Sequence, residues 1–136
     1  AAGPHHVSFL LLVFATGAIL AGGNIDNDIR DTGPDEIHPR KRKIIGNEIP
    51  PASARIWYFM LNIMALGAAF LILIQTKNIL LTAAFPLAIF LLFLYSSKLK
   101  NSILTGNILI AGLCALAVYI PSLLAAPCPV LAVKAG

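Results

Sequence analysis

The chain has 136 residues, of which 58% are hydrophobic and only 12% are charged, and its mean hydropathy is +0.84. A soluble domain usually carries about a quarter charged residues, so this composition excludes an ordinary soluble domain and indicates an integral membrane protein. We attribute the formal net charge of +4 to membrane topology, because the sequence contains no recognisable nucleic-acid-binding module. A transmembrane helix needs about 20 residues, and we count four such helices.

Four apolar stretches are long enough to cross a membrane, and they cover residues 7–23, 56–75, 79–95 and 103–126. The second stretch opens with Trp57 and Tyr58, and aromatic side chains of this kind lie at membrane interfaces. Pro86 in the third stretch and Pro121 near the end of the fourth predict kinks, which neighbouring helices tolerate in lipid. The expected fold is therefore all-α: a polytopic bundle of about four transmembrane helices, forming a single domain over residues 1–136.

A dense polar island, residues 24–49, connects the first two spans and holds every acidic residue of the chain. Within it, Asn27, Asp31 and Asp35 are spaced so that they would share one face of an α-helix, with Asp28 alongside. Magnesium takes oxygen ligands and is usually held by one or two carboxylates together with substrate phosphate oxygens. Carboxylates without thiolate or histidine partners fit magnesium better than zinc. The spacing therefore predicts a magnesium site for a phosphate-bearing substrate.

Four consecutive cations, residues 40–43, follow the acidic cluster. Arginine and lysine side chains pair with phosphate oxygens, arginine through a bidentate fork and lysine as a point charge. Together with the metal they would neutralise a leaving diphosphate. A charged loop that merely joins two membrane helices is the alternative. We favour the functional interpretation because of the three-point spacing, the adjacent cations and the position at the end of an apolar helix.

The cations also predict an orientation, because lysine and arginine concentrate in cytoplasmic connections. Lys77 and Lys134 lie on one side of the predicted spans. The other eight cations lie on the first and third connections: Arg30, Arg40, Lys41, Arg42, Lys43, Arg55, Lys98 and Lys100. We therefore expect a cytoplasmic aspartate-rich loop at residues 24–55 and a cytoplasmic basic loop at residues 96–102, in a multi-pass protein of a prokaryotic plasma membrane.

Two ordered motifs on this predicted face resemble those of the UbiA-type intramembrane prenyltransferases. Residues 27–35 match the family's first aspartate-rich motif, Asn-Asp-x-x-Asp-x-x-x-Asp. Residues 95–100 are similar to its Tyr-Ser-x-x-Leu-Lys segment, and Gly106-Asn107 to the Gly-Asn that follows. The resemblance runs from about residue 21 to residue 124 and implies a larger all-helical enzyme bundle of which this chain is a part.

The resemblance implies magnesium-dependent transfer of a prenyl group from a prenyl diphosphate to a lipophilic acceptor. It implies catalytic roles for Asp31, Asp35 and Lys98. Asn27, Asp31 and Asp35 would hold the magnesium ion. Contacts to the substrate would come from Asn27, Asp28, Arg42, Lys43, Tyr95, Lys100 and Asn107.

Lys41 and the run Arg42-Lys43-Ile44-Ile45-Gly46 resemble the branch of the family that transfers geranylgeranyl groups to geranylgeranylglycerol phosphate. This likeness implies a glycerol-phosphate lipid as acceptor. An aromatic quinone precursor, such as 4-hydroxybenzoate or dihydroxynaphthoate, stays open as the other acceptor. In either case the expected partners are the two substrates and membrane lipid, with no nucleic acid.

Two departures from the family pattern bear on these expectations. Gly33-Pro34 interrupts the aspartate motif, and proline cannot continue a helix interior, so Asp35 would reach the metal from a loop. No Asp or Glu follows Glu48, whereas the family carries a second aspartate-rich motif in its C-terminal half. We therefore expect the chain to correspond to about the N-terminal half of such an enzyme, with the C-terminal half as its partner. The alternative is a non-catalytic membrane fragment or a lipid-phosphate-binding scaffold subunit.

Overall fold

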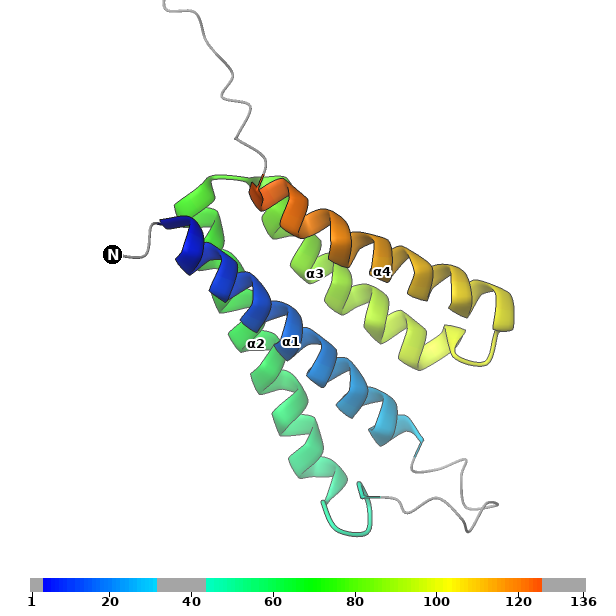
Figure 1. Ribbon diagram of the computed structural model, residues 1–136. Helices are drawn as coiled ribbons and strands as arrows, with labels where there is room; N and C mark the ends of the chain where they lie inside the picture. The colour runs from blue at the N-terminus through cyan, green and yellow to red at the C-terminus, as the bar shows by residue number, and fades with distance from the viewer. Residues whose placement is uncertain (1–3, 32–43, 126–136) are drawn as a thin grey trace, which may run out of the picture.

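The structure is a computed structural model and describes residues 4–31 and 44–125. In this part of the chain it consists of helices α1 (Pro4–Arg30), α2 (Pro51–Thr76), α3 (Ile79–Leu94) and α4 (Ile103–Ala125), with a π-helical turn, η2 (Tyr95–Leu99), continuing α3 (Figure 1). All four long helices are long and apolar enough to cross a membrane. The predicted all-α bundle is therefore confirmed.

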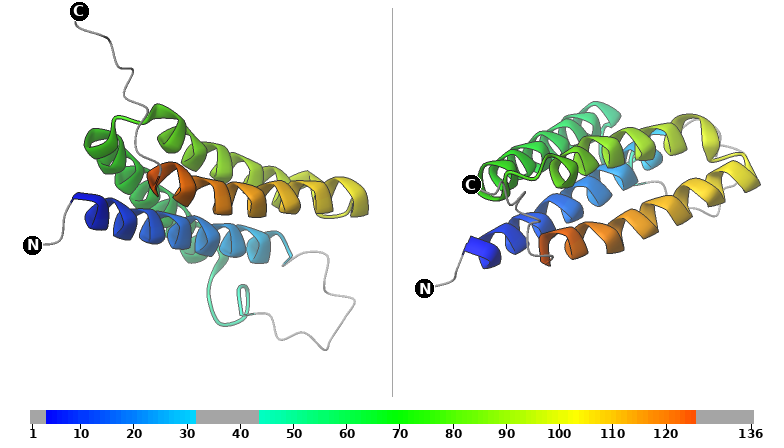
Figure 2. Two further views of the ribbon diagram at one scale, coloured as in Figure 1. Left: turned by 45° about the horizontal axis from the view of Figure 1, so that its top comes forward. Right: turned by 90° about the horizontal axis from the view of Figure 1, so that it is seen from above.

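The helices run alternately up and down, so that the connections gather at two ends (Figures 1 and 2). One end holds the last turn of α1, the start of α2, η2 and the start of α4; we call it the aspartate end. It carries the described cations of the first and third connections, Arg30, Arg55, Lys98 and Lys100, whereas Lys77 lies in the turn between α2 and α3 at the opposite end. This separation agrees with the distribution of cations expected from the sequence.

The helix boundaries differ from the expected ones at the aspartate end. The first predicted span ends at Gly23, but α1 continues to Arg30. The polar residues continue the helix because Asp26 and Arg30, one turn apart, form an ion pair of 2.9 Å. The expected loop 24–55 therefore begins in α1 and ends in α2, and the expected loop 96–102 begins inside η2.

Small residues bring α1 and α2 into close contact. Ala15 and Ala18 of α1 and Ala65 and Ala69 of α2 are all buried. On the same interface, a Cβ added to Gly22 would lie 3.1 Å from Asn62 Nδ2. Helices in lipid associate through van der Waals contact, which small side chains permit by letting the backbones approach. The α1–α2 pair is therefore the tightly packed half of the bundle.

The third helix completes the core. Leu81 and Phe85 of α3 are 0% and 2% exposed, respectively, and pack in one cluster with residues of α1 and α2. Nearer the aspartate end, a Cβ added to Gly23 would lie 3.1 Å from Leu92 Cδ1, so the glycine lets α3 approach α1. Pro86 lies inside α3 and Pro121 inside α4, as the sequence predicted. This packing sets α3 and its π-helical turn beside the polar end of α1.

Candidate functional site

The last turns of α1 present Asp26, Asn27 and Asp28, and Asp31 directly follows the helix. The Asp31 N–H donates to the Asn27 carbonyl at 3.1 Å, so these two predicted metal ligands are one helical turn apart on one face, as the spacing predicted. Asp28 is exposed. The third predicted ligand, Asp35, lies outside the described residues, as do Arg42 and Lys43. Within the described ranges no group of three His, Cys, Asp or Glu side chains is placed to hold a metal.

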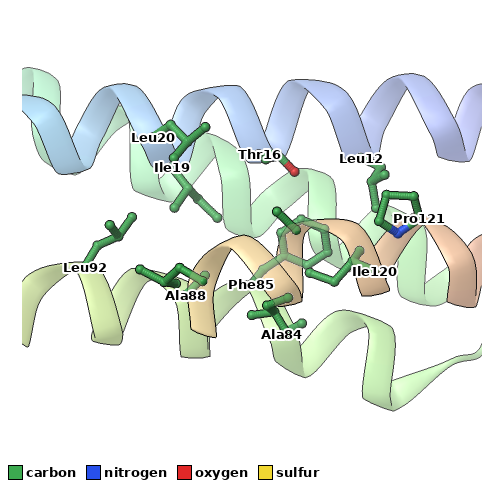
Figure 3. Close-up of a pocket in the computed structure, with 13 residues that line it drawn as sticks. Leu12, Thr16, Ile19, Leu20, Ala84, Phe85, Ala88, Leu92, Ile120 and Pro121 are labelled. Carbon is green, nitrogen blue, oxygen red and sulfur yellow. The ribbon is translucent and has the colours of Figure 1, made fainter. Parts of the chain in front are cut away.

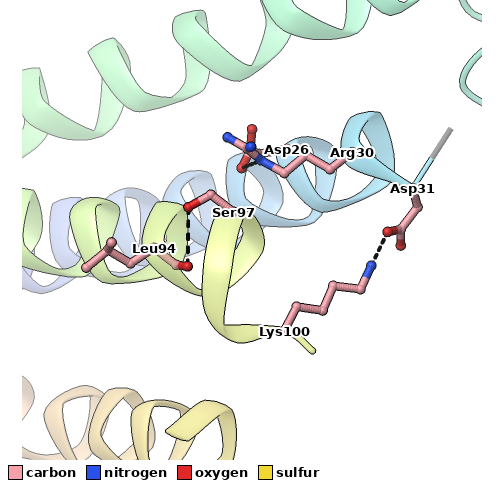
Figure 4. Close-up of polar contacts among 6 residues, drawn as sticks. All are labelled: Asp26, Arg30, Asp31, Leu94, Ser97 and Lys100. Atoms are coloured by element: carbon pink, nitrogen blue, oxygen red, sulfur yellow. Dashed lines mark hydrogen bonds and ion pairs between the residues drawn. The ribbon is translucent and has the colours of Figure 1, made fainter. Parts of the chain in front are cut away.

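An ion pair joins the two sequence motifs. The Lys100 ammonium contacts the Asp31 carboxylate across 69 residues of sequence (Figure 4). Their side chains are 34% and 35% exposed, respectively, so the pair lies at the edge of the bundle. The structure therefore brings Lys100 to the aspartates. Lys98, to which the sequence analysis gave a catalytic role, is exposed and does not contact Asp31.

The π-helical turn explains why Lys100 makes this contact. The Lys100 N–H donates to the Tyr95 carbonyl at 2.9 Å, a bond between residues five apart. A π-helical turn holds one residue more than an α-helical turn, so it gives Lys100 a different direction from the one that a continued α-helix would give it. The sequence gave no signal for this turn. Single π turns occur frequently at functional sites.

Tyr95 packs against the start of α4. A Cβ added to Gly106 would lie 3.4 Å from the Tyr95 ring and 2.9 Å from the Leu99 carbonyl oxygen. Only glycine fits at position 106 without a shift of the backbone, which explains the glycine of the second motif by packing. Asn107, the next residue, is exposed near the start of α4. Among the predicted substrate contacts in this motif, Lys100 forms the ion pair with Asp31.

A second polar contact, which the sequence analysis missed, ties α1 to α3. Asp26 is 8% exposed and accepts a 2.9 Å bond from Arg30 Nε, as Figure 4 shows. The Arg30 guanidinium carbon lies 4.9 Å from the centre of the Phe93 ring, a distance at which cation and ring attract each other. The signal in the sequence was the Asp-to-Arg spacing of four residues. These contacts fix the last turn of α1 against α3.

Two buried oxygens at the aspartate end have no hydrogen-bond partner among the described residues: Asn27 Oδ1 and Ser96 Oγ. Most buried polar atoms in proteins are hydrogen-bonded. Asn27 Oδ1 is a hard oxygen donor, and the Asp31 carboxylate follows it by one turn. This donor set fits a magnesium ion, which takes few protein ligands and keeps several waters.

An apolar cavity of about 100 Å³ lies between α1, α3 and α4 (Figure 3). It is lined on α1 from Leu12 to Leu20, and Thr16 is the polar residue of its lining. Phe85 and Ala88 of α3 and Ile120 of α4 also line it. Because Leu20 lies nearer than Leu12 to the aspartates along α1, the cavity extends from the bundle interior toward the aspartate end.

A sequence model of the UbiA prenyltransferase family matches residues 1–131. The chain belongs to the UbiA prenyltransferase family. The family resemblance inferred from the motifs is thereby confirmed. Together with four helices able to cross a membrane, membership of the UbiA family identifies the chain as an integral membrane protein. Residues 27–31, the described part of the first motif, lie beside the second motif at the aspartate end.

Curated relatives within the UbiA family include digeranylgeranylglyceryl phosphate synthases from three organisms. The protein from Methanopyrus kandleri is 33% identical over 107 residues, which cover 79% of this chain and 38% of the relative. The one from Methanoculleus marisnigri is 33% identical over 104 residues (76% and 36%). The one from Methanococcus aeolicus is 30% identical over 108 residues (79% and 37%). The chain thus spans less than two fifths of the length of these relatives. No solved structure matches it.

Proposed function

We propose that this chain forms the diphosphate-binding part of a magnesium-dependent prenyltransferase, which transfers a prenyl group from a prenyl diphosphate to a glycerol-phosphate lipid. The ion pair between Asp31 and Lys100 carries the proposal. It joins a carboxylate from the first motif to a cation from the second. A metal-bound diphosphate needs both kinds of group, because carboxylates hold the metal and cations pair with the remaining phosphate oxygens.

In this proposal Asn27 and Asp31 hold the magnesium ion, with Asp35 as the third ligand. The bound metal would offset the negative charge that develops on the departing diphosphate. Lys100 would exchange its contact with Asp31 for a phosphate oxygen, since the metal then balances the Asp31 charge. Arg42, Lys43 and Lys98 are proposed as further cations around the same diphosphate, with Asp28, Tyr95 and Asn107 beside them.

The identity of the relatives supports the choice of acceptor. All three are named digeranylgeranylglyceryl phosphate synthase, a name that fits a glycerol-phosphate lipid better than an aromatic quinone precursor. The positions of the cations support the proposed orientation, with the aspartate end in the cytoplasm and the chain in a prokaryotic plasma membrane. Arg30, Arg55, Lys98 and Lys100 lie at that end, as the cytoplasmic preference of cations requires.

Lys100→Gln is expected to weaken magnesium-dependent binding of inorganic diphosphate roughly tenfold, the effect of losing one hydrogen bond to a charged group. Lys98→Gln removes the same charge two residues away, from an exposed side chain that forms no ion pair with Asp31, and is expected to weaken this binding less than Lys100→Gln does. Isothermal titration of the purified variants in detergent measures both affinities. Equal losses in the two variants would show that only the overall charge of the segment matters and would contradict the assignment of Lys100.

We propose that the apolar cavity binds part of the prenyl tail. At about 100 Å³ it is smaller than the roughly 300–1,000 Å³ of typical ligand pockets, so it would hold only a segment of a long tail. Ala88→Phe, which fills the cavity from α3, is expected to weaken geranylgeranyl diphosphate binding several-fold and to leave inorganic diphosphate binding unchanged. Ala83→Phe is the control, because Ala83 is exposed on the same helix. Unchanged binding of both ligands in Ala88→Phe would place the tail elsewhere.

The proposed function is tested by incubating the chain in detergent with magnesium, geranylgeranyl diphosphate and geranylgeranylglycerol phosphate. Binding of the diphosphate is followed by titration, and the ether product by mass spectrometry. Magnesium-dependent binding is the expected result, and product would extend it to catalysis by this chain alone. Binding that depends on the cations but not on magnesium or Asp31 would contradict the proposal and support a lipid-phosphate-binding scaffold.

A further inference from the structure

Ser96, in the π-helical turn, carries a buried hydroxyl that has no hydrogen-bond partner in the described part of the chain. The residue is 6% exposed, and its Oγ makes no hydrogen bond to any residue that the structure describes. Serine in a helix often satisfies its hydroxyl on the carbonyl of the preceding turn, and the adjacent Ser97 does so by donating to the Leu94 carbonyl at 3.3 Å (Figure 4). Burial of an unsatisfied hydroxyl is unfavourable, so Ser96 Oγ is suited to a ligand atom.

Ser96 and Asn27 each lie about one turn before a member of the ion pair between Lys100 and Asp31. Helices α1 and α3 run in the same direction toward the aspartate end (Figure 1), and η2 continues α3 beside the last turns of α1. Asn27 precedes Asp31 by four residues, and Ser96 precedes Lys100 by four residues. The residues that precede the ion pair by four positions on both elements therefore carry the two buried oxygens that lack a partner among the described residues, Asn27 Oδ1 and Ser96 Oγ.

The chemistry of the two groups is complementary. Asn27 Oδ1 is only an acceptor, so it suits a cation or a donor, whereas the Ser96 hydroxyl can also donate. A metal-bound diphosphate presents both a cation and anionic oxygens. A hydrogen bond from a buried hydroxyl to an anionic oxygen is of the stronger, charge-assisted kind.

We propose that Ser96 is a further diphosphate-binding residue, whose hydroxyl donates to a phosphate oxygen while Asn27 Oδ1 faces the metal side of the same group. This inference rests on the proposed function and adds a residue that the motif spacing left without a role. The group that Ser96 would bind is a diphosphate, and it is the same group in free diphosphate and in a prenyl diphosphate. The π-helical turn would then have two effects: it brings Lys100 to the aspartates and presents the Ser96 hydroxyl beside them.

The test compares Ser96→Ala with Ser97→Ala in the full chain. Titrations with magnesium and either inorganic diphosphate or geranylgeranyl diphosphate measure the affinities. Ser96→Ala is expected to weaken the binding of both ligands roughly tenfold to a hundredfold, and Ser97→Ala to bind both as the wild type does. Ser96→Ala should melt no lower than the wild type, because it removes a polar atom that has no partner among residues 4–31 and 44–125 and leaves the packing almost unchanged.

The outcomes separate this inference from the proposed function. Wild-type affinity in Ser96→Ala, together with lost binding in Asp31→Asn, would overturn the role of Ser96 and leave the diphosphate site in place. Weaker binding of geranylgeranyl diphosphate with unchanged binding of inorganic diphosphate would place Ser96 against another part of the substrate and would also overturn it. A wild-type chain that binds neither ligand would overturn both proposals.

Discussion

Asp31→Asn is expected to abolish the magnesium-dependent binding of geranylgeranyl diphosphate to this chain. The substitution keeps the size of the side chain and removes the charge that holds a hard cation. Mutation of a residue that only hydrogen-bonds to a metal ligand lowers metal affinity about ten- to a hundredfold. Loss of a direct ligand should therefore lower the affinity at least about a hundredfold. Titration of the wild type and the variant, with and without magnesium, measures the effect.

The fold should survive this substitution. The Asp31–Lys100 ion pair is about one third exposed on both sides, and exposed ion pairs contribute only about 0–1 kcal/mol to stability. Asp26→Asn is the control for charge, because it removes one carboxylate from the same helix at a position that is buried against Arg30. That variant should melt at a lower temperature and lose much less affinity. Equal losses of affinity in the two variants would contradict a specific metal ligand at Asp31.

Ala65→Leu is expected to have the largest effect on stability. Ala65 is 0% exposed and lies one turn along α2 from Asn62, which faces Gly22 of α1. A leucine there would separate α1 and α2, and overpacking of this kind costs about 1–3 kcal/mol or more. Thermal melting of the helical circular dichroism signal in detergent measures the change.

Gly67→Leu is the matched control on the same helix. No atom lies within 4 Å of a Cβ added at Gly67, and the residue is exposed, so the new side chain would face lipid. This variant should melt close to the wild type. If both variants melted at the same lowered temperature, the tight α1–α2 interface would not be the source of the stability.

The sequence predicted the membrane-spanning helices well because each is a long apolar stretch between charged segments. It ended the first span too early, at Gly23 instead of Arg30, although the spacing of Asn27 and Asp31 indicated that the helix continues. There the ion pair of Asp26 with Arg30, and the packing of Arg30 on Phe93, satisfy polar groups that a sequence pattern alone leaves exposed. The end of α1 is therefore supported by one contact within the helix and one contact with α3.

The site was predictable in outline and not in detail. Motif spacing indicated Asn27 and Asp31, and helix α1 does place them one turn apart. Spacing could not decide whether Lys98 or Lys100 contacts Asp31, because the answer depends on a π-helical turn that no residue pattern predicts. The unpartnered oxygen of Ser96 likewise emerges only from burial. The roles of Asp35, Arg42 and Lys43 stay predictions.

The most direct test of a diphosphate site at the aspartate end uses manganese in place of magnesium. Electron–nuclear double resonance of the Mn²⁺-loaded chain with geranylgeranyl diphosphate detects phosphorus nuclei bonded through oxygen to the metal. We predict a ³¹P coupling in the wild type that disappears in Asp31→Asn. A metal that binds without a ³¹P coupling, or a coupling unchanged in Asp31→Asn, would contradict the proposal that the first motif holds a metal-bound diphosphate.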